Sequence, residues 1–196
     1  PSPGGAVYAA GDDVFVYNYG TIIGGGASSD DAGIYFAGQN GSVDNYGRIQ
    51  GTNGVHFNSG HSLSSAYVEN SGVIEGTEHG AKFNESGIIT NHGTLTGSNG
   101  NGATISGYGD VTNLGTISGA TGIYIGGNCG IENFGEIIGT NGDGITVVGT
   151  ATITNEDSLS SITGTMHGVL IHNGGQLDNR GGTIGGTFGV VSTSPT

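Results

Sequence analysis

The sequence predicts an all-β solenoid, in which one short unit of alternating apolar and polar residues repeats along the chain. Residues 111–125, VTNLGTISGATGIYI, are one copy of the unit. Three observations support this prediction. An asparagine recurs at intervals in the twenties, apolar residues flank it at every second position, and glycines close each unit. Self-similarity with such a period is the signature of a stack of coils.

The asparagine column sets the number of coils. Its spacing predicts about eight coils, each of roughly 20–27 residues. An aliphatic residue precedes each asparagine by two positions. In the first six units a glycine follows by two positions, isoleucine or leucine by four, and a second glycine by six. The asparagines are Asn18, Asn45, Asn70, Asn91, Asn113, Asn133, Asn155 and Asn179.

A second segment recurs in each coil as glycine, an apolar residue, a variable residue and another apolar residue. It occupies residues 33–36, 54–57, 80–83, 102–105, 122–125, 144–147 and 168–171. Both segments alternate with period two, and successive side chains of a strand point to opposite faces, so both are predicted strands. Nothing in the chain has a helical period. The glycines are expected to supply positive φ at the turns between strands.

Along the chain, a single solenoid domain is predicted for residues 1–196. A partial first coil covers residues 5–17, where Ala6 and Tyr8 are predicted to face inward. Regular coils follow over residues 18–154, and irregular coils over residues 155–191, where extra residues separate Asn155 from its closing glycine.

The composition suits thin stacked coils better than a compact globule. Only 33% of the residues are hydrophobic and 44 are glycine, whereas a solenoid needs only a few inward aliphatics from each coil. The formal net charge of −13, with three basic residues, argues against binding to nucleic acids or to anionic membranes. No apolar run is long enough to insert into a membrane. Cys129 is expected to be a small filler in a turn and not a nucleophile.

The repeated asparagine, aromatic residue, glycine, threonine and isoleucine, followed by Gly-Ile-x-Ile, resembles the repeats of bacterial autotransporter passengers and related filamentous surface adhesins. The resemblance covers residues 5–191. It implies a right-handed single-stranded parallel β-helix with three short strands per coil, the third ending at each asparagine. It also implies an extracellular or bacterial cell-surface location. The variable length of the coils differs from the fixed hexapeptides of left-handed relatives.

The asparagines are predicted to form a structural ladder. Counting by two from the preceding aliphatic places each asparagine inward at a bend, where its amide can donate and accept hydrogen bonds along the stack. Function is expected at outward positions, where exposed aromatic rings stack on sugars or anchor a protein. Cross-strand packing also accounts for such rings. The candidate surface-binding residues are Tyr19, Tyr46, Tyr35, Tyr124 and Phe134.

Catalytic and metal sites are weakly indicated. Glycosidases need two carboxylates about 5–10 Å apart, and stacking offers Glu69 with Asp44 or with Glu75, or Glu132 with Glu136. An acidic outward column is also what a solvated face looks like, so we expect no enzyme. We also expect no cofactor and no metal, since residues 141–144 are a single approach to a calcium-binding repeat. An ice-binding threonine ladder is expected to be interrupted beside Thr94.

The sequence favours a non-catalytic extracellular structural or adhesive solenoid. It would be a bacterial surface fibre, stalk or adhesin segment that presents loops 24–32 and 58–66 to a cell-surface protein or glycan. The alternative is a filament subunit that stacks end to end on itself through uncapped coils. A polysaccharide-degrading β-helix enzyme is a third hypothesis.

Overall fold

A computed structural model describes residues 5–26, 31–58 and 66–193. Within these residues every regular element is a β-strand, and no helix is long and apolar enough to cross a membrane. The predicted all-β fold is therefore confirmed. Much of the two loops expected to contact a partner, namely 27–30 and 59–65, lies outside the described residues.

One face of the solenoid is an eight-stranded sheet. Each of its strands ends on one of the predicted asparagines, which stand in register from coil to coil. The strands, in spatial order, are β2 (Phe15–Asn18), β5 (Ser42–Asn45), β7 (Ala66–Asn70), β9 (Gly87–Asn91), β12 (Gly109–Asn113), β15 (Cys129–Asn133), β18 (Ala151–Asn155) and β21 (Gly175–Asn179).

A fifteen-stranded sheet forms the other two faces. The face that follows the asparagines contains β3 (Thr21–Ile23), β10 (Thr94–Gly97), β13 (Thr116–Gly119), β16 (Glu136–Gly139), β19 (Ser161–Gly164) and β22 (Thr183–Gly185). The second-segment face contains β1 (Gly5–Ala9), β4 (Ala32–Phe36), β11 (Ala103–Ile105), β14 (Ile123–Ile125), β17 (Ile145–Val147), β20 (His167–Ile171) and β23 (Phe188–Ser192). The long strands β6 (Arg48–Phe57) and β8 (Val73–Phe83) contribute to both faces.

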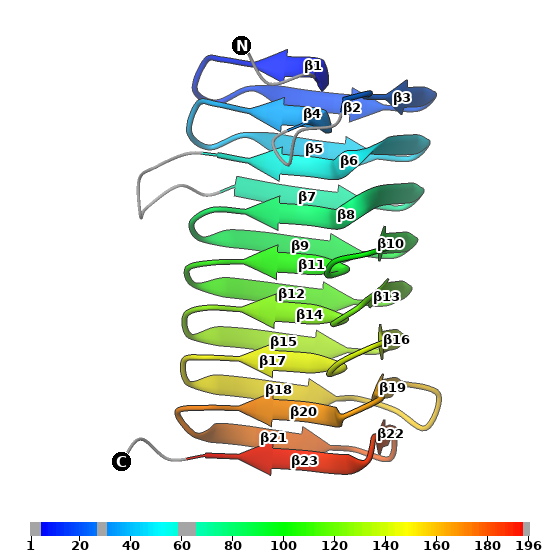
Figure 1. Cartoon of the computed structure of the whole chain (residues 1–196), viewed down its shortest axis with the longest axis vertical. Coiled ribbons are helices and arrows are strands. Elements are labelled where there is room, and N and C mark those ends of the chain that lie inside the picture. The colour runs from blue at the N-terminus through cyan, green and yellow to red at the C-terminus, as the bar shows by residue number, and fades with distance from the viewer. Residues whose placement is uncertain (1–4, 27–30, 59–65, 194–196) are drawn as a thin grey trace.

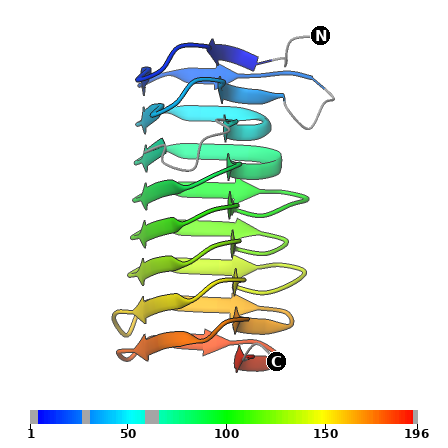
Figure 2. The ribbon, with the colours of Figure 1, turned by 90° about the vertical axis from the view of Figure 1, so that its left-hand side faces the viewer.

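Each coil thus supplies three strands to a stack of about seven turns, slightly fewer than the eight coils predicted. All strand pairings are parallel. Figures 1 and 2 show the coils stacked in one column and wound in the right-handed sense, the hand that parallel crossover connections adopt.

The core is a set of apolar columns along the axis of the solenoid. Phe36, Phe57 and Phe83 stack at ring distances of 4.6 and 4.7 Å. A second column of aliphatic residues has no exposed surface, because each member is covered by the same position of the next coil: Ile49, Ile74, Leu95, Ile117, Ile137 and Ile162. The predicted alternation of inward and outward residues is correct for these strands.

Two sequence expectations about the fold are wrong. Val7, and not Ala6 or Tyr8, faces inward in β1, since Val7 is paired with the core residue Ile34 and Tyr8 is 52% exposed. The repeated glycines are also required for a different reason. Among the described glycines only Gly174, Gly175 and Gly181 have positive φ.

Close stacking of turns explains the glycine that follows the ladder asparagines. A Cβ atom on Gly115 would lie 2.1 Å from the carbonyl oxygen of Gly93 in the preceding coil, and one on Gly135 would lie 2.1 Å from that of Gly115. The backbone at this corner leaves no room for a side chain.

The irregular coil keeps the same register and places its extra residues outside it. Residues 156–160 project from the corner between β18 and β19 (Figure 1), while Ser161 still pairs with Glu136. The Asp157 carboxylate accepts hydrogen bonds from the amides of Leu159 and Ser160 at 2.8 and 3.0 Å, which orders the projection. Leu159 at its tip is 84% exposed.

Candidate functional site

The asparagine ladder runs the length of the described coils. From Asn18 to Asn155, each side-chain amide donates to the Oδ1 atom of the next asparagine at 2.7–2.9 Å. Asn113, for example, also donates to the carbonyl oxygens of Gly115 and Glu136, both at 3.1 Å. These bonds satisfy buried carbonyl groups of the turns, because a buried carbonyl without a hydrogen bond lowers the stability of the fold. The predicted ladder is confirmed.

Because the ladder and the aliphatic columns occupy the interior, the chemistry open to a partner lies on outward side chains. The outer face of the eight-stranded sheet carries two rows across the coils. One row, next to the asparagines, is Tyr17, Asp44, Glu69, Thr90, Thr112, Glu132, Thr154 and Asp178. The other row is Phe15, Ser42, Tyr67, Ile88, Asp110, Gly130, Thr152 and Gln176.

The first coils expose a group of aromatic rings that we call the aromatic patch. It consists of Phe15, Tyr17, Tyr19 and Tyr46, which are 64%, 63%, 75% and 49% exposed. The rings of Tyr19 and Tyr46 are stacked with centroids 5.0 Å apart and an interplanar angle of 4°. Stacking between the corners of neighbouring coils therefore orders Tyr19 and Tyr46 but leaves much of their surface open to contact.

The other predicted surface-binding residues, Phe134, Tyr124 and Tyr35, differ in how exposed their side chains are. Phe134 is 38% exposed, and Tyr124 is half-buried in β14. The prediction for Tyr35 is wrong, because its side chain is only 4% exposed. Its ring stacks on Tyr8 at 5.6 Å and meets the edge of His56 at 5.1 Å. Tyr35 therefore belongs to the packing of the second-segment face.

The structure makes register partners of one of the proposed carboxylate pairs. Asp44 and Glu69 are register partners on β5 and β7. Burial, and then the charge of Glu69, raises the pKa of Asp44. Burial, together with a like charge one coil away, produces this shift without any catalytic role. Glu132 and Glu136 lie on different faces of the coil, on β15 and β16.

The approach to a calcium repeat at residues 141–144 has a different role. Asp143 is bonded through one carboxylate oxygen to His167 Nδ1 and through the other to the Thr146 hydroxyl, both at 2.7 Å. Among the described residues no group of three or more histidine, cysteine, aspartate and glutamate side chains is arranged to hold a metal ion. The threonine ladder is interrupted as predicted, since Thr94 pairs with Val73.

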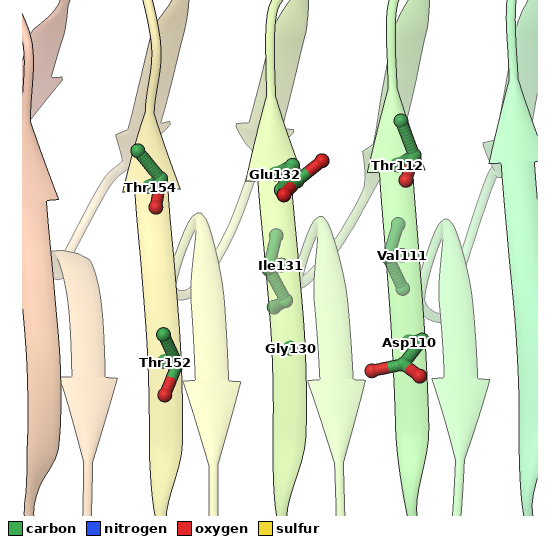
Figure 3. A pocket seen from close by; sticks show the side chains of 8 residues that line it. All are labelled: Asp110, Val111, Thr112, Gly130, Ile131, Glu132, Thr152 and Thr154. Atoms are coloured by element: carbon green, nitrogen blue, oxygen red, sulfur yellow. The ribbon is translucent and has the colours of Figure 1, made fainter.

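Sequence reasoning missed a hollow in the middle of the outer face, which we call the Gly130 notch. Its volume is about 300 Å³, and it is lined by Asp110, Val111, Thr112, Gly130, Ile131, Glu132, Thr152 and Thr154 of β12, β15 and β18 (Figure 3). Gly130 lies between Asp110 and Thr152 in the row and has no side chain to fill the space. The glycine is visible in the sequence, but Cys129 is expected there to lie in a turn, whereas Cys129 and Gly130 begin β15.

Two neighbours shape the notch. The Asp110 carboxylate leans over Gly130, so that a Cβ atom placed there would be 2.8 Å from Asp110 Oδ1. The Tyr108 hydroxyl donates to the same Oδ1 atom at 2.7 Å, and this hydrogen bond is the main cause that raises the pKa of Tyr108. On the inner side, burial and the nearby Asp110 raise the pKa of Cys129 to about 12. Its thiol stays protonated at neutral pH, as expected of a filler.

No protein-family model, curated protein or solved structure matches this chain. What is established is the class: a parallel β-solenoid with an internal asparagine ladder. The resemblance to autotransporter passengers stays a resemblance of repeats.

Proposed function

We propose that this chain is a non-catalytic structural and adhesive solenoid, a segment of an extracellular bacterial surface fibre, stalk or adhesin. The observation that carries the proposal is the aromatic patch. Tyr17 on β2 and Tyr19 in the turn after it are more than 60% exposed, and the inward residue of β2, Val16, already packs against the core. The core therefore does not need these rings.

A stiff scaffold with exposed rings suits adhesion. Tyrosine supplies a large contact area with few rotatable bonds, and its apolar face stacks on sugars or fills pockets of a protein. The ladder holds the rings in fixed positions, so that little conformational freedom remains to be lost on binding. With a net charge of −13, the partner would be a neutral or basic protein or glycan at a cell surface.

Bead adhesion tests this proposal. Fluorescent beads coated with the purified chain are applied to bacterial and epithelial cell layers. The test variant combines Tyr17→Ser, Tyr19→Ser and Tyr46→Ser, and the control is Leu159→Ser, which removes an exposed apolar side chain from the projecting corner. We expect the patch variant to lose at least about tenfold of the bound beads, as hot-spot aromatics do, and the control to keep them. Equal adhesion by both variants, or no adhesion by the native chain, would refute the proposal.

End-to-end stacking into a filament is the second candidate. The ladder is polar, since each asparagine amide donates toward the next coil, and Val190 occupies the inward register of Val169 yet is 47% exposed. Two copies could therefore continue one ladder head to tail. Val190→Asp should abolish fibres in negative-stain microscopy while leaving the circular dichroism spectrum unchanged. Fibres that persist would exclude this contact.

A further inference from the structure

The Gly130 notch is the cavity of the outer face that the aromatic patch does not use. It spans three successive coils, since Asp110, Gly130 and Thr152 are register partners. Its volume of about 300 Å³ is at the lower end of small-molecule pockets, enough for part of a larger ligand. The floor is strand backbone, which holds the shape of the hollow.

The polar side chains around the notch present oxygen. Figure 3 shows the carboxylates of Asp110 and Glu132 and the hydroxyls of Thr112, Thr152 and Thr154 around the bare backbone of Gly130. The two carboxylates are acceptors, and the hydroxyls can accept as well. A ligand that fits this set must bring several O–H or N–H donors close together. Hydrogen bonds from such donors to carboxylates are charge-assisted and strong.

The negative charge around the notch distinguishes neutral ligands from acidic ones. Two of the three basic side chains of the chain are paired elsewhere: Arg48 with Glu75, and Arg180 with Glu156 and Asp178. The third, Lys82, lies in β8 on the second-segment face. The carboxylates of the notch therefore repel uronic, sialic and sulfated groups, whereas neutral hydroxyls are accepted.

Tyr108 adds an apolar surface at the edge of the notch. Its ring is 50% exposed, and the hydrogen bond of its hydroxyl to Asp110 holds it beside the carboxylate. An aromatic face next to grouped acceptors suits a pyranose ring, which has an apolar C–H face and a rim of hydroxyls.

From this shape and chemistry we infer that the Gly130 notch is a subsite for one ring of a neutral glycan. Vicinal hydroxyls of that ring donate to Asp110 and Glu132, and its C–H face packs on Tyr108. The inference deepens the proposed adhesive function, on which it rests, by naming a ligand class. The notch on β12, β15 and β18 is separate from the aromatic patch on the first two coils, so either site can fail without the other.

The test begins with a glycan array that carries neutral, amino, uronic and sulfated oligosaccharides, probed with the native chain in a buffer that contains EDTA. We expect binding to neutral members and none to the acidic ones. The strongest neutral oligosaccharide is then titrated against variants by saturation-transfer NMR. Gly130→Thr fills the notch, and Asp110→Asn keeps its shape but removes the charge. Each should weaken binding at least about tenfold. Asp110→Asn removes a charged hydrogen bond, for which this loss is expected, and Gly130→Thr places a side chain where the sugar ring would lie.

Gly185→Thr is the matched control. It makes the same change at a strand glycine of another face, where the nearest heavy atom to an added Cβ is 3.7 Å away, and it should bind within about twofold of the native chain. Thermal melting of each variant checks the fold. Binding to acidic glycans only, no binding to neutral glycans, or equal affinity of Gly130→Thr and Gly185→Thr would overturn the inference. A blank array together with intact bead adhesion would remove the notch site and leave the proposed function standing.

Discussion

The middle and the last coils of the solenoid carry the same repeat but differ in how well it is buried. In the middle, Asn113 and Ile137 have no exposed surface. In the last coil, Asn179 is exposed and Leu177 and Ile184 are only partly buried, although each keeps its register partner in the preceding coil. The repeat thus determines pairing, whereas burial depends on a neighbour on both sides. An inward residue should therefore contribute more stability in the middle of the stack.

The middle and the last coils also differ in the length of their corners, although their strands keep the same register. Two residues join Asn133 to β16, whereas five join Asn155 to β19. Both strands nevertheless lie in register. A longer connection at this corner can project outward because the ladder asparagine, and not the length of the turn, aligns the next strand.

The largest effect is expected for the ladder. Asn113→Leu would remove the acceptor of one Asn91 amide bond and the donor to Asn133 and to the carbonyls of Gly115 and Glu136. It should lower the free energy of unfolding by about 3 kcal/mol. Asn179→Leu removes the bonds to Gly182 and from the Asn155 amide, but in an exposed coil where water can replace them, and should cost less than about 1 kcal/mol. Urea denaturation of the two variants compares them. Equal losses would show that position in the stack does not matter.

Alkaline pH should weaken the middle coils through Cys129. Its folded pKa of about 12 exceeds the ordinary thiol value of 9.0, so between these values the unfolded chain loses a proton that the folded chain keeps. Stability therefore falls as pH rises above 9, by up to about 1.4 kcal/mol per pH unit. Denaturation of the native chain and of Cys129→Ala from pH 8 to 11 isolates this effect. The difference in unfolding free energy between the two proteins should change with pH, and a constant difference would contradict it.

The projecting corner should be replaceable at small cost. If residues 156–160 are exchanged for Leu-Gly, the pair that follows Asn113, the free energy of unfolding should change by less than about 1 kcal/mol, since corner length has a small entropic effect. The reciprocal exchange, with EDSLS in place of residues 134–135, should behave alike. Denaturation and circular dichroism measure both variants. Loss of the folded state in either would show that the corner also positions the strand.

The smallest effect is expected at an outward position of a middle coil. Thr116 is half-buried on β13 and points away from the core, so Thr116→Leu should change the free energy of unfolding by less than about 0.5 kcal/mol. Differential scanning calorimetry alongside Asn113→Leu gives the contrast. Similar melting shifts would mean that the inward and outward assignment is wrong for this coil.

The sequence by itself determined the coils, the ladder and most inward columns. These follow from the two-residue alternation of strands and from the recurrence of one unit, both of which are local properties. A local pattern misled at the first strand, where Ala6 and Tyr8 were predicted to face inward. The structure instead pairs Gly5 with Ala32 and places Val7 inward.

Only the tertiary structure decided which outward residues are open to a partner. Tyr35 and Tyr19 both lie at outward positions, yet one is 4% and the other 75% exposed, because burial outside the core depends on what packs over each face. The Gly130 notch likewise required the register of β12, β15 and β18, which brings Asp110 beside a glycine of the next coil. Alternation along one strand determines whether a side chain points inward or outward. The residues that surround that side chain belong to other coils, and their positions depend on the register between coils.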